Sequence, residues 1–258
     1  MSVCRCVTTE DACSAYPCVA GKTVPWSNAL QLSRDWFDQN LGRSVEGLHV
    51  LGEDGVPAGH LYWCGSDRVL LPYYLEPGTA TVLCEWVDHK HRGRGMARDM
   101  YASLIDTLRA KGCKGIFVEA TDEVEYMHRR HFEIRGFQPV LEWARGCLMY
   151  LPISQAQAAA QAVPLNLPQF SDAPVEVVVV GSLFCPVSAS TLLTLREVAA
   201  SFRGKVRLLE FPASRQVVES WGIGHGMFVN GWERFIGPVS RAAVLKTLED
   251  AVGERQRC

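Results

Sequence analysis

A strand, a turn rich in glycine and arginine, and a helix follow one another between residues 81 and 112, and this unit restricts the fold more than any other feature of the chain. The segment TVLCEWV at 81–87 is predicted to be a strand. Residues 95–111 have apolar side chains at helical spacing, and Gly112 is a typical residue after a helix end. The sequence therefore predicts an α/β fold in its first half. The apolar helix positions are Met96, Met100, Leu104, Ile105 and Leu108.

The turn between this strand and helix favours an anion. The first N–H groups of a helix have no intrahelical partner, and the helix dipole is positive at the same end. Glycine lets a ligand approach the backbone closely. Arg92, Arg94 and Arg98 add charged donors that suit a phosphate. The alternative is a solvated basic loop that only caps the helix.

The turn sequence also resembles a known motif. Arg92-Gly93-Arg94-Gly95-Met96-Ala97 is similar to Arg/Gln-x-x-Gly-x-Gly/Ala, the pyrophosphate motif of the GCN5-related N-acetyltransferase (GNAT) family. The resemblance covers roughly the first 150 residues, and HFEIRGF at 131–137 is similar to the family segment FYEKxGF. It implies a mixed sheet flanked by helices and acetyl-CoA, or another acyl-CoA, as the ligand. A Walker loop is excluded because the Gly-Lys-Ser/Thr ending is missing, and a Rossmann turn would need a third glycine.

The resemblance implies positions for the ligand. In the family, backbone amides equivalent to Gly93, Arg94, Gly95, Met96 and Ala97 hold the pyrophosphate. The pantetheine arm pairs with the edge of the strand that ends at Trp86 and Val87. An N–H group in that region can stabilise the thioester oxyanion, which places the reacting carbonyl beside residues 85–88.

Acyl transfer to an amine needs a base, because a free alkylamine has a pKa near 10.4 and must lose a proton before it attacks. Glu85 is the candidate, as a base acting through water or as a substrate contact. It lies two residues before Val87 and therefore on the same face of the strand. The family tends to have an apolar residue here, and its known bases lie further back, near Thr81 or Leu83.

The leaving thiolate of CoA needs a proton, and Phe132 stands where the family has its proton-donating tyrosine. Tyr126 is the candidate replacement, and His128 and His131 are the alternatives. Two family positions on the same predicted helix, usually Asn and Ala, are Glu125 and His128 here. A thiolate with a pKa of about 8.5 can also leave without an acid.

The other expected elements of the first half are a strand near 3–8, a short helix, and a helix over 26–41. A hairpin of strands 46–52 and 56–64, a strand over 114–120, a helix near 124–135 and a strand pair within 137–151 complete it. An Ala/Gln- and Pro-containing stretch then changes the composition abruptly. We therefore expect an acetyltransferase domain at 1–153, a linker at 154–173 and a second domain at 174–258.

The second half has the element order of the thioredoxin fold. A continuous apolar strand from Val175, a turn and a helix are followed by a strand at 205–211, a hairpin around Asn230-Gly231 and a helix over 240–252. The resemblance implies a smaller thioredoxin-like α/β domain, with Cys185-Pro186-Val187-Ser188 at the place of the family's CxxC.

Cys185 is a possible redox thiol, for which the helix N-terminus predicts a lowered pKa. With Ser188 in place of a second cysteine, only a mixed disulfide could form, which favours a binding or accessory role. The two-domain order resembles bacterial YoaP-type proteins. The shared marks are Cys18, the segment from Cys84 to Val87 and the terminal Asn-Gly hairpin.

Composition limits the partners and the compartment. The net charge of −2 over 258 residues gives no general attraction to nucleic acid or a membrane. No signal peptide or membrane-spanning run is visible, so we expect a cytoplasmic protein. The expected partner is a small-molecule or peptide amine, and the oligomeric state is open. Ten cysteines are scattered, and although Cys4, Cys6, Cys13 and Cys18 could hold a soft metal, their spacing gives no ligand turn, so we predict no metal site.

Two functions follow from these observations. The main hypothesis is an N-acetyltransferase that uses acetyl-CoA as co-substrate and carries a thioredoxin-like domain. The alternative is a thiol-based sensor or thiol-exchange protein whose first domain binds CoA without turnover. A purely structural module would leave the arginine-glycine turn unexplained.

Overall fold

The structure, a computed structural model, describes residues 2–123, 126–155, 159–168, 175–181, 183–235 and 239–255. The chain divides into two compact units. The first comprises Met1–Gly21, Phe37–Val69 and Tyr73–Ala162, and the second Lys22–Trp36, Leu70–Pro72 and Val163–Cys258. Glu125 and parts of the expected linker, 156–158 and 169–173, lie outside the described residues. The boundaries expected from composition stay a prediction.

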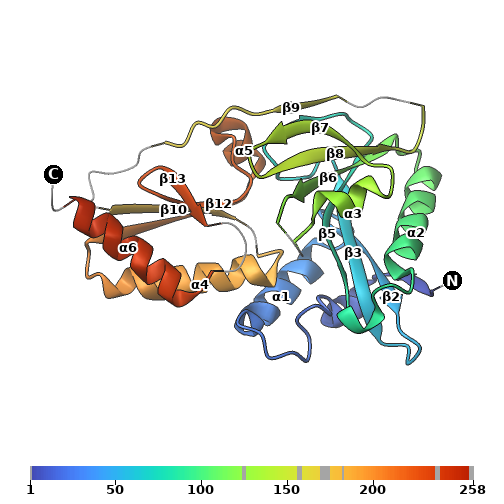
Figure 1. Cartoon of the computed structure of the whole chain (residues 1–258), viewed down its shortest axis with the longest axis horizontal. Helices are drawn as coiled ribbons and strands as arrows, with labels where there is room; N and C mark the ends of the chain where they lie inside the picture. The colour runs from blue at the N-terminus through green and yellow to red at the C-terminus, as the bar shows by residue number, and fades with distance from the viewer. Residues whose placement is uncertain are drawn as a thin grey trace. The chain divides into compact units, whose positions relative to one another are not determined.

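The first unit is built on a mixed sheet of seven strands in the order β1-β2-β3-β5-β6-β8-β7 (Figure 1). Only the pair β5–β6 is parallel, and the other neighbours are antiparallel. The predicted α/β fold with a mixed sheet is confirmed. The strands are β1 (Cys4–Cys6), β2 (Glu46–Leu51), β3 (Pro57–Gly65), β5 (Ala80–Val87), β6 (Gly115–Thr121), β7 (Gln138–Trp143) and β8 (Gly146–Pro152).

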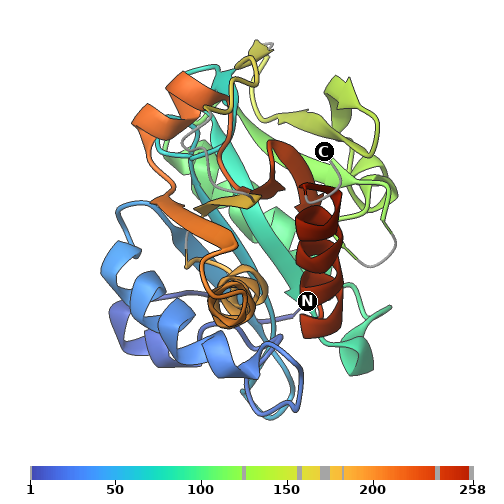
Figure 2. The same cartoon turned by 90° about the vertical axis from the view of Figure 1, so that its left-hand side faces the viewer.

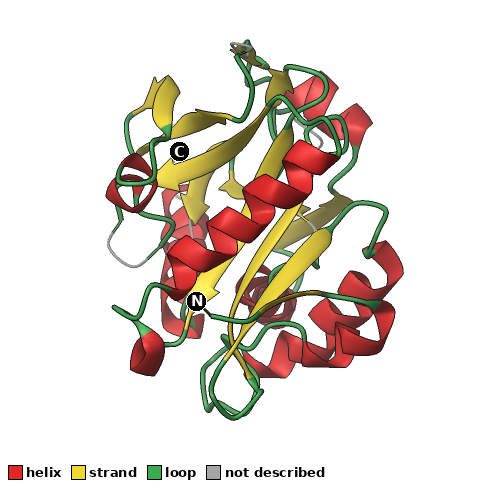
Figure 3. Cartoon of the chain, turned by 90° about the vertical axis from the view of Figure 1, so that its right-hand side faces the viewer, coloured by secondary structure: helices red, strands yellow, loops and turns green. Residues whose placement is uncertain are grey.

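Helix α2 (Met96–Ala110) runs across one face of this sheet (Figure 3). Four of the five predicted positions are buried and Ile105 is partly buried, while Asp99 and Tyr101 are buried without having been predicted. Helix α3 (Arg129–Glu133) packs on the same core through Phe132. It is shorter than the expected helix over 124–135, because the His128 side chain caps its N-terminus. The sequence did not indicate the small two-stranded sheet of β4 (Tyr73–Leu75) and β9 (Ala160–Ala162).

Three short 3-10 helices and α1 complete the first half of the chain. The 3-10 helices are η1 (Thr9–Ser14), η2 (Ser27–Ala29) and η3 (His89–His91), and α1 spans Leu30–Asn40. Together η2 and α1 occupy the range where the sequence predicts one helix, 26–41. Among the described residues, no helix is long and apolar enough to cross a bilayer.

The sheet face opposite α2 carries a buried cluster of aromatic and histidine side chains. Tyr62 is at its centre, with its hydroxyl 3.2 Å from His49 Nε2 and accepting a hydrogen bond from the Tyr16 N–H at 3.0 Å. Phe37 and Tyr16 pack their rings against Tyr62. Burial lowers the pKa of His49 from 6.5 to about 4, although the negative charge of Asp11 opposes this shift. The neutral imidazole is therefore the form that fits the folded protein.

His49 makes the stability of the protein sensitive to acid. Between pH 6.5 and pH 4 the unfolded chain protonates this histidine while the folded chain does not, so stability falls as the pH drops through this range. His49→Gln removes the titration and keeps a polar group beside Tyr62. The loss of unfolding free energy between pH 7 and pH 4.5 is expected to be about 2 to 3 kcal/mol smaller in the variant. Urea unfolding at both pH values measures it, and His89→Gln, at an exposed position, serves as the control. Equal pH dependence in wild type and His49→Gln would contradict the assignment.

The second unit contains a four-stranded sheet in the order β11-β10-β12-β13. Strand β10 is parallel to β11 and antiparallel to β12, and β12 is antiparallel to β13. The elements are β10 (Val175–Gly181), α4 (Pro186–Ser201), β11 (Val206–Pro212), α5 (Arg215–Trp221), β12 (Gly226–Val229), β13 (Trp232–Phe235) and α6 (Arg241–Arg255). The predicted smaller sheet with helices is confirmed in this coarse form.

Alternating residues of β10 build a core on each side of the small sheet. Val177 and Val179 pack with α4 and α6, whereas Val178 and Val180 pack on the side of α5. Figures 1 and 2 show α4 and α6 together on one face and α5 on the other. The sequence did not indicate α5, a short helix that the Ser214 side chain caps at one end and Gly222, in the left-handed conformation, terminates at the other.

Candidate functional site

Strands β5 and β6 part halfway along their length. They pair only from Ala80↔Ile116 to Val82↔Val118, although β5 continues to Val87 and β6 to Thr121. In the described part of the chain, no strand pairs with β5 on this side from Leu83 onward. The free edge of β5, residues 83–87, contains Trp86 and Val87.

A β-bulge bends β5 at the same place. Tyr62 of β3 lies opposite Cys84 and Trp63 lies opposite Val82, so Leu83 is an additional residue on β5. A bulge increases the local bend and twist of a strand. It therefore explains in part why β5 turns away from β6 after Val82.

The turn after β5 presents unused backbone donors. Gly93 and Gly95 have φ angles of +78° and +82°, a region that glycine adopts without the strain that a side chain would cause. Gly95 is the N-cap of α2, and its carbonyl accepts from Asp99 N–H at 3.0 Å. Within the described residues, the N–H groups of residues 93–97 donate to no protein atom. These N–H groups, at the positive end of a helix, are the donors that a phosphate requires.

The arginine side chains around the turn are solvent-exposed. Arg94 lies 3.7 Å from the Glu53 carboxylate, Arg92 donates to the Val87 carbonyl at 3.4 Å, and Arg98 contacts the adjacent Asp99. A methyl group built on Gly93 would meet no atom within 4 Å. The turn is therefore open, and its residues fit a pyrophosphate-bearing ligand.

Glu85 lies within hydrogen-bond distance of a histidine that the sequence placed among the alternatives. His131 Nε2 lies 2.7 and 2.8 Å from the two carboxylate oxygens of Glu85. The Glu85 side chain is 6% exposed and that of His131 is 36% exposed. The carboxylate is therefore shielded from solvent, while the histidine beside it is partly exposed. A proton can pass between Glu85 and solvent through the His131 ring.

Two further side chains surround this pair on the α2 and α3 side of β5. Tyr101 is buried, and burial together with the negative charge of Glu85 raises its pKa. The Arg135 guanidinium lies over the Tyr101 ring at 5.3 Å and also donates to the His131 carbonyl. Sequence reasoning missed both residues. One signal links Arg135 to His131: the two residues are four apart within the helix that the sequence predicts over 124–135.

The other acid candidates have described contacts with residues other than Glu85. Tyr126 is 44% exposed, and its described hydrogen bonds use its backbone: its carbonyl accepts from the Thr121 hydroxyl, and its N–H donates to the Glu123 carbonyl. His128 Nδ1 accepts from the Arg130 N–H at 3.2 Å and so caps α3. Phe132 is buried in the core. Of these residues and His131, only His131 has a described contact with Glu85.

A second carboxylate lies beside the gap between β5 and β6, on the opposite sheet face. Glu119 follows Val118, the last β6 residue paired with β5, and accepts a hydrogen bond from the Tyr73 hydroxyl at 2.9 Å. Tyr73 stacks on Trp143 with ring centroids 6.1 Å apart. Burial and the nearby carboxylate raise the pKa of Tyr73. No cation pairs with Glu119 among the described residues, and sequence reasoning missed this group because Tyr73 lies in a strand that was not predicted.

Cys185 differs from its sequence-based prediction. It is the N-cap of α4, but burial raises the pKa of its thiol, and this effect exceeds the lowering by the N–H groups of Val187 and Ser188. The prediction of a lowered pKa is wrong because desolvation of the half-buried Cys185 outweighs the local effect of the helix N-terminus. Within the second unit, the neighbouring Phe184 packs edge-to-face on Trp36 at 5.6 Å.

This difference predicts slow alkylation. At neutral pH, iodoacetamide should modify Cys185 more slowly than the exposed Cys6 and Cys13, because a half-buried thiol with a raised pKa supplies little thiolate. Peptide mass spectrometry over a time course measures the three rates. Labelling of Cys185 ahead of both exposed thiols would contradict this prediction.

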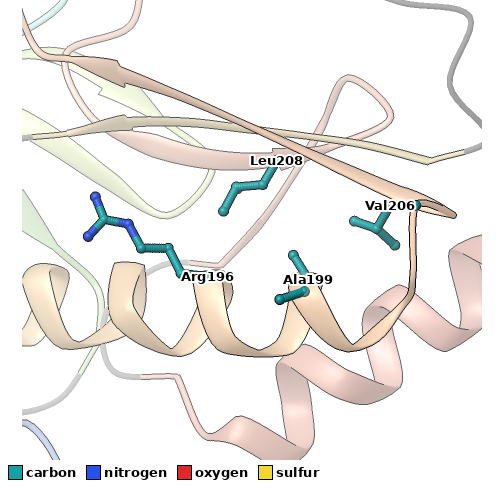
Figure 4. Close-up of a pocket in the computed structure, with 6 residues that line it drawn as sticks. Arg196, Ala199, Val206 and Leu208 are labelled. Atoms are coloured by element: carbon teal, nitrogen blue, oxygen red, sulfur yellow. The ribbon is translucent and has the colours of Figure 1, made fainter.

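Two further features were considered as functional sites: clusters of metal ligands and a pocket in the second unit. No group of three or more His, Cys, Asp or Glu side chains that could hold a metal occurs among the residues described. A shallow pocket of about 290 Å³ lies between α4 and β11 (Figure 4). Arg196 at its rim is paired with Glu210 at 2.6 Å, and the other lining residues carry no titratable group: Ala199, Ala200, Gly204, Val206 and Leu208.

Part of the chain matches a known protein family. Residues 10–137 match the family model described as "Acetyltransferase (GNAT) family". No curated protein matches the chain. Similar solved structures include a putative acyl-CoA N-acyltransferase from Klebsiella pneumoniae, with 18% identity over 59% of this chain and 98% of that chain and a TM-score of 0.43. The ribosomal-protein-S18-alanine N-acetyltransferase from Escherichia coli has 20% identity over 61% and 97%, with a TM-score of 0.44. The PaiA N-acetyltransferase from Thermoplasma acidophilum, in complex with coenzyme A, has 9% identity over 58% and 99%, with a TM-score of 0.44.

Proposed function

We propose, from the premise that residues 10–137 form an acetyltransferase domain of the GNAT family, that this N-acetyltransferase moves an acetyl group from acetyl-CoA to an amine of a small molecule or a peptide. The observation that carries the proposal is the turn at 93–97, whose unused N–H groups adjoin the free edge of β5. The turn supplies donors for a diphosphate, and the free edge supplies donors and acceptors for an extended amide chain.

Each part of the turn and strand has a role in this proposal. The N–H groups of Gly93, Arg94, Gly95, Met96 and Ala97 hold the pyrophosphate, and the exposed Arg92 guanidinium adds charge. Trp86 and Val87 pair through their backbone with the pantetheine arm. An N–H group near Glu85 then lies beside the thioester carbonyl, where it stabilises the negative charge that develops on oxygen. Acetyl-CoA supplies the activated acetyl group.

Proton transfer is assigned to Glu85 and His131. Their contact at 2.7 Å supports a pair in which His131 exchanges a proton with the reacting groups and Glu85 orients its ring and balances its charge. We assign to His131 the role of the acid that protonates the leaving CoA thiolate, because Phe132 has no proton to donate. Tyr126 stays a prediction as an acid, because its described hydrogen bonds are through its backbone.

The acceptor is assigned to the opposite face of the gap. A partly buried carboxylate without a cationic partner is costly in a protein, and a bound ammonium group would offset this cost. Glu119, with Tyr73 and Trp143 beside it, is such a carboxylate and supports an amine as the acceptor. Aromatic faces additionally attract cations.

For the second unit we propose a thioredoxin-like accessory domain. The strand order β11-β10-β12-β13, with β10 parallel to β11 and antiparallel to β12, supports this fold. The raised pKa of the half-buried Cys185 thiol supports a binding role over a redox role.

A panel of amines tests the proposed function. The full chain is incubated with acetyl-CoA and single amines, polyamines or peptides, and free thiol is measured. Amine-dependent thiol release with an acetylated product is expected for at least one acceptor class. Tight acetyl-CoA binding with no release for any amine would favour the thiol-sensor alternative, since such a protein binds CoA without turnover.

A further inference from the structure

A thiol and an imidazole lie in contact on the sheet face opposite Glu85. His60 Nε2 of β3 is 3.3 Å from Cys84 Sγ of β5. The His60 side chain is fully buried, whereas Cys84 is only half-buried. The imidazole is therefore enclosed by the protein, whereas Cys84 retains some exposure to solvent.

Aromatic rings fix the orientation of the histidine. The His60 ring stacks on Tyr62 with centroids 4.3 Å apart and an interplanar angle of 12°. The indole of Trp86 is also nearly parallel to it, at 6.1 Å and 24°. A thiol beside an imidazole that cannot rotate freely is the arrangement of an activated cysteine nucleophile.

The position of Cys84 relates this pair to the acyl site. Cys84 follows the bulge residue Leu83 and lies on the free edge of β5, beside the backbone assigned to the thioester. Successive side chains of a strand point to opposite faces, so Cys84 and Glu85 flank this edge from opposite sides. A nucleophile thus lies on one side of the thioester, and a proton-transfer pair lies on the other.

We propose that Cys84 accepts the acetyl group before the amine does, with His60 as its base. This inference rests on the proposed use of acetyl-CoA. The Cys84 thiol gives its proton to His60 Nε2, and the thiolate attacks the thioester carbonyl. A new bond forms between Sγ and the acetyl carbon, the bond from that carbon to the CoA sulfur breaks, and the proton on His60 passes to the departing CoA thiolate. The neutral amine then attacks the carbonyl carbon of the Cys84 thioester, a bond forms between this carbon and nitrogen, and the bond from the carbon to Sγ breaks. The amine nitrogen loses one proton, which passes to the Cys84 thiolate through His60, so that the amide leaves and the thiol is restored.

The energetics of this route are compatible with the chemistry. The first step replaces one alkyl thioester by another, so the acetyl group stays activated on the protein. The imidazole 3.3 Å from Sγ provides a proton acceptor for the thiol, and the thiolate, not the thiol, is the nucleophile. By contrast, burial raises the pKa of Cys64 to about 12, which makes that thiol a poor nucleophile.

Mass spectrometry of the intact chain tests the proposal. The full protein is incubated with acetyl-CoA in the absence of any amine, quenched in acid and weighed. One added acetyl group is expected, which hydroxylamine removes and which peptide mapping locates at Cys84. Cys84→Ala should carry no label there. Cys113→Ala, a change at another half-buried thiol, should be labelled like the wild type.

His60 is tested by the rate of labelling. His60→Gln is expected to acetylate Cys84 at least about 100-fold more slowly, since a positioned base contributes about that factor or more. Calorimetric titration with CoA verifies that this variant still folds and binds. A second measurement needs no variant: the wild type should exchange labelled CoA into acetyl-CoA without an amine, because the first step is reversible.

The outcomes separate this inference from the proposed function. A wild-type chain that binds acetyl-CoA and acetylates an amine, but that stays unlabelled and exchanges no CoA without the amine, overturns the covalent route alone. Label that persists in Cys84→Ala overturns it as well. A chain that does not bind acetyl-CoA overturns both.

Discussion

Gly95→Trp is expected to reduce the affinity for acetyl-CoA at least about 100-fold. Gly95 lies between the N–H groups of the turn, and an indole there would cover the space in front of them. Hydrogen bonds to a charged group contribute about 1.5 to 3 kcal/mol each, so losing two of them corresponds to about 100-fold or more. Isothermal titration calorimetry with acetyl-CoA and with CoA measures the change.

Gly112→Trp is the matched control for this prediction. Gly112, at the other end of α2, also has a left-handed backbone, with a φ angle of +70°, and a methyl group added to it would meet no atom within 4 Å. Both variants incur a similar backbone cost of roughly 1 to 2 kcal/mol for a side chain in this conformation. A methyl group at Gly95 would also lie 3.0 Å from the Arg98 guanidinium, which is the end of an exposed side chain and can move away. Thermal unfolding should show similar losses, whereas only Gly95→Trp should lose the ligand. Unchanged acetyl-CoA affinity in Gly95→Trp would overturn the assignment of the turn.

Glu85→Gln is expected to lower kcat about 100-fold and to change the KM for acetyl-CoA little. The amide oxygen of glutamine can still accept the hydrogen bond from His131, so the packing is retained, but the negative charge that balances a protonated His131 is lost. General acid–base catalysis contributes about 100- to 10,000-fold, which sets the size of the effect. Steady-state kinetics with the acceptor found in the amine panel give both constants.

A double variant shows whether Glu85 and His131 act as one unit. His131→Asn alone should lower kcat by a similar factor, and the double variant should be no slower than the slower single variant, because residues that act together are not additive. Glu197→Gln, the same change at an exposed side chain of α4, is the control. A full kcat in Glu85→Gln would show that the pair is structural only.

The location of the glycine-arginine turn was predictable from local sequence. Glycines at 93 and 95 adopt the left-handed conformation that the motif requires, and the strand before them and helix after them form where residue patterns indicate. Such features depend on neighbours within a few residues. The pKa of Cys185 was not predictable in this way, because burial, which depends on distant parts of the chain, outweighed the local effect of the helix end.

The candidate catalytic contacts depend on tertiary structure. Glu85 and His131 are 46 residues apart, as are Tyr73 and Glu119, and Cys84 and His60 are 24 apart. Sequence patterns indicate which face of a strand a side chain occupies but not which distant side chain packs against it. The bulge at Leu83 likewise arises from the pairing of β5 with β3.

The sequence by itself thus determined the α/β elements, the glycine-arginine turn and the position of Glu85 on its strand, because periodicity and glycine act locally. Only the tertiary structure decided that β5 separates from β6, that Glu85 pairs with His131 and that Cys84 meets His60. These features follow from strand register and from packing between residues far apart in the chain, which one sequence does not specify by inspection.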